Sequence, residues 1–123
     1  MTNNDRKYWN EDVETLSPQD MKALQWKRLK KQLQYNFENS VYYREEKFQK
    51  AGLTPDDIRT FDDFQKIPLF TKDEHRRIQA DSIQQFGHPY GLITCAPREK
   101  IVRINSTSGT TGQPTLYTLT QND

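Results

Sequence analysis

The stretch IVRINSTSGTTGQPTLYTLT, residues 101–120, carries the strongest structural signal in the chain. Residues 101–104 and 115–120 alternate in character and are rich in β-branched side chains, which favours two strands. Between them, residues 106–114 contain two glycines and five hydroxyl side chains. The sequence therefore predicts a β-hairpin that carries a loop of serine, threonine and glycine, called here the Ser/Thr/Gly loop (residues 106–114).

The composition of this loop is typical of an anion-binding segment. Gly109 and Gly112 allow close approach of the backbone to a ligand and positive φ angles. Hydroxyl groups add donors that can rotate onto phosphate oxygens, and they come from Ser106, Thr107, Ser108, Thr110 and Thr111. The spacing is not that of a Walker A loop, because two residues separate the glycines and Gln113 follows them. A hydroxyl-rich hairpin turn without a ligand is the alternative interpretation.

Helical patterns precede the hairpin. Ser17 and Pro18 combine a favourable N-cap with a proline suited to the first turn, so a helix is expected to begin there. Apolar residues at steps of three and four then predict an amphipathic helix whose apolar stripe faces the core. The stripe comprises Ala23, Trp26, Leu29, Leu33, Phe37 and Val41.

Three further helices are expected before the chain turns to strands. One covers residues 41–50 and ends at Gly52, which suits the left-handed position after a helix. Thr60 and Thr71 each precede an acid by three residues, a capping pattern that predicts two short helices, the second ending near Phe86. The predicted fold class is α+β, with residues 1–86 mainly helical and residues 100–120 forming strand, loop and strand.

Composition narrows the classes of function. The 18 Lys and Arg residues nearly balance 17 Asp and Glu, so the net charge of +1 provides no field for nucleic acid or an anionic membrane. A single cysteine, Cys95, excludes an internal disulfide, and no apolar run approaches the roughly 18 residues of a membrane span. The cytoplasm is the expected compartment. Only 33% of the residues are hydrophobic, which favours a chain that needs a partner surface.

Other residues that attract a functional interpretation are expected to be structural. His75, His88 and Cys95 lack the spacing of metal ligands, so no metal site and no catalytic residue are assigned. The pair Arg76-Arg77 is interpreted as solvated surface charge. Four aromatic residues are expected to anchor packing, namely Trp9, Trp26, Tyr42 and Tyr43.

The segment Arg103–Thr115 resembles the nucleotide loop of acyl-adenylate-forming enzymes, and specifically of the phenylacetate–CoA ligase family. Flanking segments resemble the amino-terminal region of that family in the same order, so that the likeness extends from about Tyr8 to Thr120. They are Tyr8-Trp9-Asn10, Leu16-Ser17, Leu24-Gln25, Asn39-Ser40, Tyr42-Tyr43-Arg44, Lys47-Phe48, Ala51-Gly52-Leu53, Asp57-Ile58, Ile67–Lys72, Pro89–Leu92 and Pro97-Arg98-Glu99.

The resemblance implies an enzyme that activates an aryl or arylacetic acid with Mg-ATP and transfers the acyl group to coenzyme A. The nucleotide-binding residues carried over from the family are Ser106, Thr107, Ser108, Gly109, Thr110, Thr111, Gly112 and Gln113, which would hold the β- and γ-phosphates. Thr115 matches a threonine where many members of the wider superfamily have lysine, and Gln113 stands where lysine is common in the family.

In that family the adenine and carboxylate pockets, the magnesium ligands and a mobile carboxy-terminal domain follow the matched stretch. The resemblance therefore implies that residues 1–123 form the amino-terminal portion of an adenylate-forming ligase domain and are inactive alone. Two alternatives stay open: a non-catalytic helical interaction module, and one chain of a split ligase. The open edges of a lone hairpin also predict self-association or a complementary chain.

Overall fold

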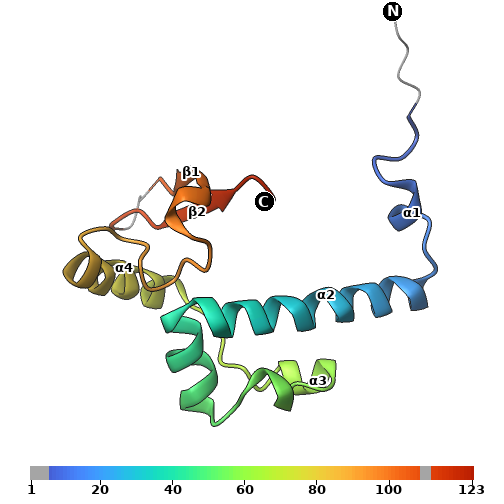
Figure 1. The fold of residues 1–123 in the computed structure, drawn as a ribbon, viewed down its shortest axis with the longest axis horizontal. Helices are drawn as coiled ribbons and strands as arrows, with labels where there is room; N and C mark the ends of the chain where they lie inside the picture. The colour runs from blue at the N-terminus through green and yellow to red at the C-terminus, as the bar shows by residue number, and fades with distance from the viewer. Residues whose placement is uncertain (1–5, 109–111) are drawn as a thin grey trace, which may run out of the picture.

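The protein is α+β, as the sequence predicts: a helical region is followed by one two-stranded sheet (Figure 1). The computed structural model describes residues 6–108 and 112–123. In chain order the elements are α1 (Glu11–Glu14), α2 (Pro18–Asn39), the π-helix η1 (Tyr43–Phe48), the 3-10 turns η2 (Gln49–Ala51) and η3 (Pro55–Asp57), α3 (Phe61–Phe64), α4 (Lys72–Phe86), the 3-10 turn η4 (Arg98–Lys100), β1 (Ile101–Ser106) and β2 (Leu116–Thr120).

The predicted helix starts are confirmed by their caps. Ser17 accepts a hydrogen bond of 3.1 Å from the amide of Asp20, and Pro18 opens α2. Thr60 and Thr71 each form a full capping box, with Asp63 and Glu74 respectively. Gly87 takes a φ of 73° directly after Phe86, so α4 ends where the sequence predicts.

The helix expected over residues 41–50 has a different form. Residues Tyr43–Phe48 form a π-helix and Gln49–Ala51 a 3-10 turn, before Gly52 takes the predicted left-handed conformation with φ 67°. A π turn aligns residues five positions apart. Here that spacing brings Tyr42 and Lys47 to the same carboxylate, Glu74, which an α-helical periodicity does not anticipate.

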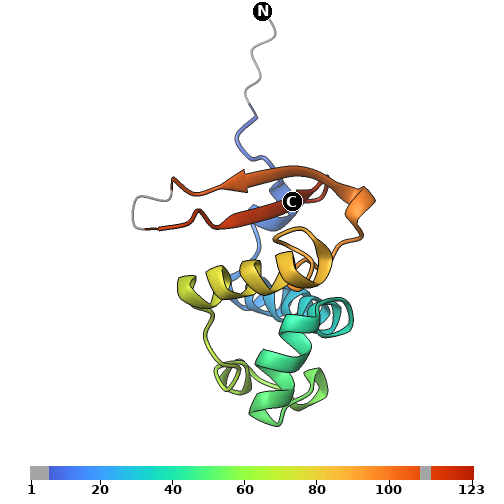
Figure 2. The same ribbon diagram turned by 90° about the vertical axis from the view of Figure 1, so that its left-hand side faces the viewer.

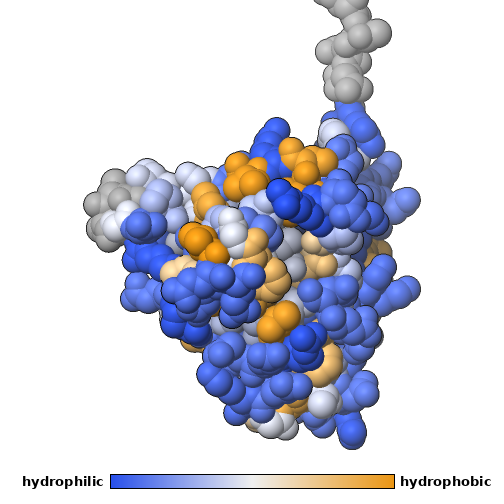
Figure 3. Space-filling view, turned by 60° about the vertical axis from the view of Figure 1, so that its left-hand side comes forward, coloured by the Kyte–Doolittle hydropathy of each residue, from blue (hydrophilic) through white to orange (hydrophobic). Residues whose placement is uncertain are grey.

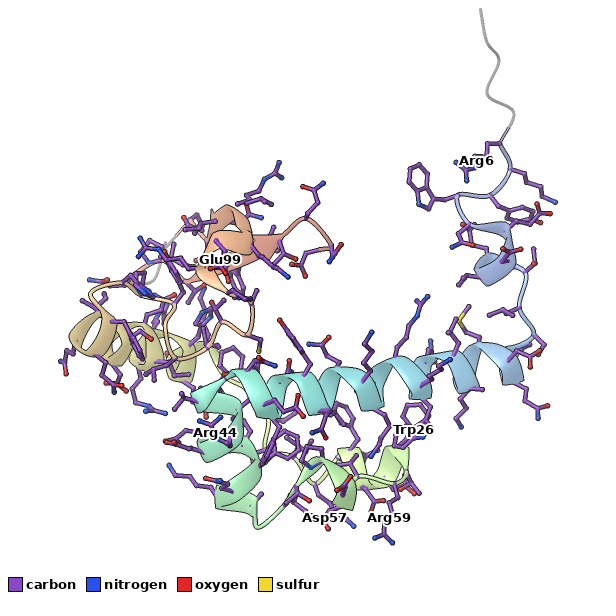
Figure 4. All side chains as sticks on the ribbon, viewed as in Figure 1. Arg6, Trp26, Arg44, Asp57, Arg59 and Glu99 are labelled. Carbon is purple, nitrogen blue, oxygen red and sulfur yellow. The ribbon has the colours of Figure 1, made fainter. Side chains whose placement is uncertain are left out.

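The core lies between α2, η1 and the segment around η3. Leu33, Phe48 and Ile58 are its buried centre, and Phe37 meets Phe48 edge to face with ring centroids 5.3 Å apart. Trp26 reaches from α2 toward α3 and lies 5.0 Å from the ring of Phe61 (Figure 4). The apolar stripe therefore packs as predicted at Trp26, Leu29, Leu33 and Phe37. The predicted stripe is too long, because Ala23 is exposed and Val41 lies beyond the end of α2.

The packing role expected of Trp9 is wrong. Its side chain is 82% exposed and its ring has the Arg6 guanidinium 5.3 Å above it. Residues before α2 stand apart from the helical core in Figure 1, which accounts for the exposure of Trp9. Among the described residues, no helix combines the length and apolar character that crossing a membrane requires.

The hairpin lies across α4 (Figure 2). Its strands are antiparallel, with Ser106 opposite Leu116 and Arg103 opposite Leu119. The register shifts between Ile101 and Arg103, so one extra residue bulges from β1 near η4, the turn that carries Glu99 (Figure 4). Val102, Ile104 and Tyr117 are exposed. On the face drawn in Figure 3, hydrophobic residues form separate patches within a mainly hydrophilic surface.

A buried lysine fixes the first turn of α4. Lys47 is only 3% exposed, and its ammonium donates to Glu74 at 2.9 Å and to the carbonyl of Leu69 at 2.5 Å. The hydroxyl of Tyr42 donates to the same Glu74 oxygen at 3.1 Å. The hydrogen bond from Lys47, followed by that from the Thr71 amide, lowers the pKa of Glu74 from 4.5 to about 2.

We expect Glu74→Gln to lower the free energy of unfolding by about 2 kcal/mol at pH 7, because it leaves the Lys47 ammonium buried without its counter-charge. The loss is smaller than for a fully buried pair, because Glu74 itself is partly exposed. The pKa of Glu74 is lower in the folded state, so its contribution is full above pH 4.5 and is lost as the pH falls toward 2. Urea unfolding of both proteins at a series of pH values should show the difference shrinking in that window. The exposed Glu45→Gln is the control. A difference that persists unchanged at pH 2 would contradict this assignment.

Candidate functional site

The Ser/Thr/Gly loop is closed at its base by Thr107 and Thr115. The Thr107 amide donates to the Thr115 carbonyl at 3.0 Å, and the Thr115 amide donates to the Thr107 hydroxyl at 3.0 Å. The two hydroxyl oxygens lie 3.2 Å apart, and Thr115 is completely buried. These bonds extend the hairpin by one pair beyond Ser106 and Leu116 and set the width of the loop.

Helix α4 holds the limb through which the chain leaves the loop. The side-chain amide of Gln79 donates to the carbonyl of Pro114 at 3.0 Å and accepts from the amide of Leu116 at 2.6 Å. One turn earlier, Nε of Arg76 donates to the carbonyl of Gln113 at 3.3 Å. Gln79 is buried, so its two bonds are shielded from water. Two side chains of one helix face therefore fix residues 113–116.

Gly112 lies beside the Arg76 side chain of α4. Its φ is 142°, a backbone conformation that residues other than glycine rarely adopt. A Cβ atom at this position would lie 3.6 Å from both Cζ and Nη2 of Arg76. The positive φ that the sequence allows at position 112 is thus present in the structure.

The residues assigned to the loop fall into three groups. Ser106 and Thr107 use their hydroxyls locally: Ser106 donates to the Thr107 carbonyl at 3.3 Å, and Thr107 braces the base. Ser108, Gly112 and Gln113 are exposed. Gly109, Thr110 and Thr111 lie outside the described residues.

The charge at the loop comes from the helix. The sequence from Ile104 to Asp123 contains no lysine or arginine. Arg76 stands against the loop, so interpreting Arg76-Arg77 as a solvated pair is wrong for Arg76: its side chain is 25% exposed, against 50% for Arg77. The loop thus combines hydroxyl and backbone groups with one neighbouring guanidinium, a combination suited to an oxyanion.

A cavity of about 790 Å³ lies between α2, the segment before η4 and β2. Cys95 and Tyr43 line it, and burial raises the pKa of the Cys95 thiol to about 11 and raises the pKa of Tyr43. His75 also lines the cavity. Burial lowers the pKa of His75, and a hydrogen bond with the backbone of Leu116 raises it by a smaller amount. Within residues 6–108 and 112–123, no three His, Cys, Asp or Glu side chains gather as a metal site would require.

Arg76 and Gln79 are the residues of this site that the sequence did not identify. The pattern gave a partial signal, because positions three apart on a helix share a face. Nothing local indicated that this face meets the loop, since the contacts span 35 and 37 residues of sequence.

Comparisons with known proteins show sequence relatives of one kind. The chain is 40% identical over 111 residues to a phenylacetate-coenzyme A ligase of Escherichia coli (strain K12), a match that covers 90% of this chain. It is 36% identical to the ligase of that name in Aromatoleum evansii and 37% identical to that in Thermus thermophilus. The chain spans about 23% of the length of these curated relatives. No protein-family model matches it.

Solved structures extend the likeness to three dimensions. The fold matches that of a 2-hydroxyisobutyryl-CoA ligase in complex with 2-HIB-AMP in the postadenylation state, with a TM-score of 0.80, at 27% identity, over 98% of this chain and 24% of that one. The structure of that ligase with 2-HIB-AMP and CoA in the thioesterification state matches with a TM-score of 0.79 at 30% identity.

We expect Gln79→Ala to release residues 114–116 from α4, because it removes both hydrogen bonds and leaves the Pro114 carbonyl and Leu116 amide without partners. Hydrogen exchange should then speed at the Leu116 amide by about tenfold or more, the equivalent of one hydrogen bond with its desolvation. The exposed Gln84→Ala on the same helix is the matched control. Unchanged protection of Leu116 would show that Gln79 does not hold this limb.

Proposed function

Because this chain is a sequence relative of phenylacetate-coenzyme A ligases, we propose that it is the amino-terminal segment of an ATP-dependent ligase that joins an aryl or arylacetic acid to coenzyme A. In this proposal the Ser/Thr/Gly loop binds the β- and γ-phosphates of ATP while the acyl-adenylate forms. The supporting observation is a loop of exposed donors at residues 108, 112 and 113, braced at Thr107 and Thr115 and held by α4.

The reaction explains what the loop contributes. A carboxylate oxygen attacks the α-phosphorus of ATP, and pyrophosphate leaves with the electrons of the broken P–O bond. The sulfur of coenzyme A then attacks the acyl carbon and the thiol loses its proton, while the bond from that carbon to the AMP oxygen breaks, so that a thioester and AMP result. Negative charge builds on the departing pyrophosphate, so donors already directed at those oxygens stabilise the transition state. A rigid base also holds the phosphates in line for the attack.

Metal and coenzyme are assigned to the whole reaction and not to residues of this chain. Mg²⁺, when bound, neutralises phosphate charge. The Ser/Thr/Gly loop contains no carboxylate, so its hydroxyls fit the hydration shell of a metal that arrives with ATP and do not form a resident site. In this proposal the chain acts in the cytoplasm, where ATP and coenzyme A are available, and has no nucleic-acid or membrane partner.

A complementary polypeptide is the second part of the proposal. Val102, Ile104 and Tyr117 expose apolar surface on a sheet of only two strands, whose outer edges are unpaired within the described residues. This observation favours a chain that completes the sheet, either a second copy or the remainder of a split ligase. It also keeps the helical interaction module as an alternative, in which the loop is only a hairpin turn.

Binding of Mg-ATP tests the loop directly. In a ¹⁵N-labelled chain, we expect Mg-ATP to shift the amide signals of Thr107, Ser108, Gly112 and Gln113, and Mg-AMP, which lacks the β- and γ-phosphates, to shift them little. Gly112→Val should abolish the response, because a β-branched residue is strained at this φ. Equal responses to ATP and AMP would contradict phosphate binding at the loop.

With phenylacetate, coenzyme A and Mg-ATP together, robust pyrophosphate release by the chain alone would contradict its assignment as a segment.

Sedimentation tests the completed sheet. We expect the sedimentation coefficient of the chain to rise with concentration, and Val102→Lys with Ile104→Lys to suppress the rise, because charge on a strand edge opposes pairing. Lys substitutions at the exposed Gln84 and Gln85 of α4 are the matched control. A sharp monomer boundary across a wide concentration range would count against self-association.

A further inference from the structure

We propose that Arg76 binds the phosphates directly and supplies the positive charge that the Ser/Thr/Gly loop lacks. This proposal rests on the proposed function of the loop and adds a residue of α4 to it. The loop offers only neutral donors, and position 113 holds glutamine. A polyphosphate carries several negative charges, so a guanidinium beside the loop strengthens its binding more than another hydroxyl would.

The position of Arg76 fits this role. Nε is bonded to the Gln113 carbonyl, and the guanidinium plane lies against Gly112, the loop residue that has no side chain to block it. The side chain is three-quarters buried, so it is held in one orientation before a ligand arrives. The same residue therefore holds position 113 through Nε and places its guanidinium beside Gly112.

One donor group of that fork is unused. Nη2 of Arg76 is buried and has no hydrogen-bond partner among residues 6–108 and 112–123. Nη1 pairs with Asp73 at 3.1 Å, but Asp73 is 92% exposed and its charge is screened by water. A buried N–H without an acceptor is costly, and a phosphate oxygen is an acceptor that matches guanidinium geometry. In this proposal a phosphate oxygen supplies the acceptor that Nη2 lacks.

Its neighbour does not share this position. Arg77 pairs with Asp81 at 3.2 Å and lies 3.7 Å from Glu46, on a different side of α4. Both of its partners are carboxylates, and its side chain is half exposed. Arg77 therefore serves as a matched control: the same residue type, adjacent on the same helix, with its charge already balanced.

The experiment uses inorganic tripolyphosphate and the ¹⁵N-labelled chain, with affinity read from the amide shifts of Gly112 and Gln113. We expect Arg76→Gln to weaken binding about tenfold, the loss typical of a charge-assisted hydrogen bond. Arg77→Gln should leave the affinity unchanged. Arg76→Lys should retain part of it, because the charge remains while the fork is lost. Asp73→Asn should tighten binding about twofold, because it removes a competing anion whose charge is largely screened.

The outcomes distinguish a failure of the role of Arg76 from a failure of phosphate binding by the Ser/Thr/Gly loop. No response of the wild-type loop to tripolyphosphate would overturn both. A wild-type response that Arg76→Gln leaves unchanged would overturn the role of Arg76 alone and preserve the loop. The Leu116 amide reports whether the hairpin is still held by Gln79 in each variant. Should Arg76→Gln release the hairpin, Asp73→Asn decides the question, and its failure to tighten binding would overturn the proposal.

Discussion

The buried side-chain amide of Gln79 is the interaction on which the arrangement of the loop depends. A hairpin of two strands is barely stable in water by itself, since it has little apolar surface to bury. Here one glutamine replaces a third strand locally: it gives a hydrogen bond to one main-chain group of the exit limb and receives one from another. The bonds are worth more because the side chain is excluded from water.

Gln79 can act in this way only because α4 is itself fixed. The carboxylate of Glu74 caps the helix at Thr71 and accepts bonds from Lys47 and Tyr42, which belong to the core region around η1. The order of dependence runs from the core through η1 to the first turn of α4, and from there to the hairpin. A charge buried at one end of this path thus helps to position the helix that holds the hairpin at the other.

How much the sequence predicts follows from the range of each interaction. The caps at Ser17, Thr60 and Thr71 are local, so three or four residues suffice to specify them, and the strands around the loop carry an equally local pattern. The π turn at η1 and the approach of Arg76 to Gly112 depend on contacts across some thirty residues, for which a single sequence holds no periodic signal. Trp9 shows the converse, since its size favours burial but it belongs to a segment that stands apart from the core and it is exposed.

Among the described residues, the attachment of the loop to α4 uses main-chain atoms on the loop side: the carbonyls of Gln113 and Pro114 and the amide of Leu116. Such bonds are indifferent to the side chains that residues 113 and 116 carry. Helix α4 can therefore keep the backbone in place while the side chains at these positions change. A loop held through its main chain tolerates substitutions that would displace a loop held by its own side chains. Its ligand preference can therefore change during evolution without loss of its position.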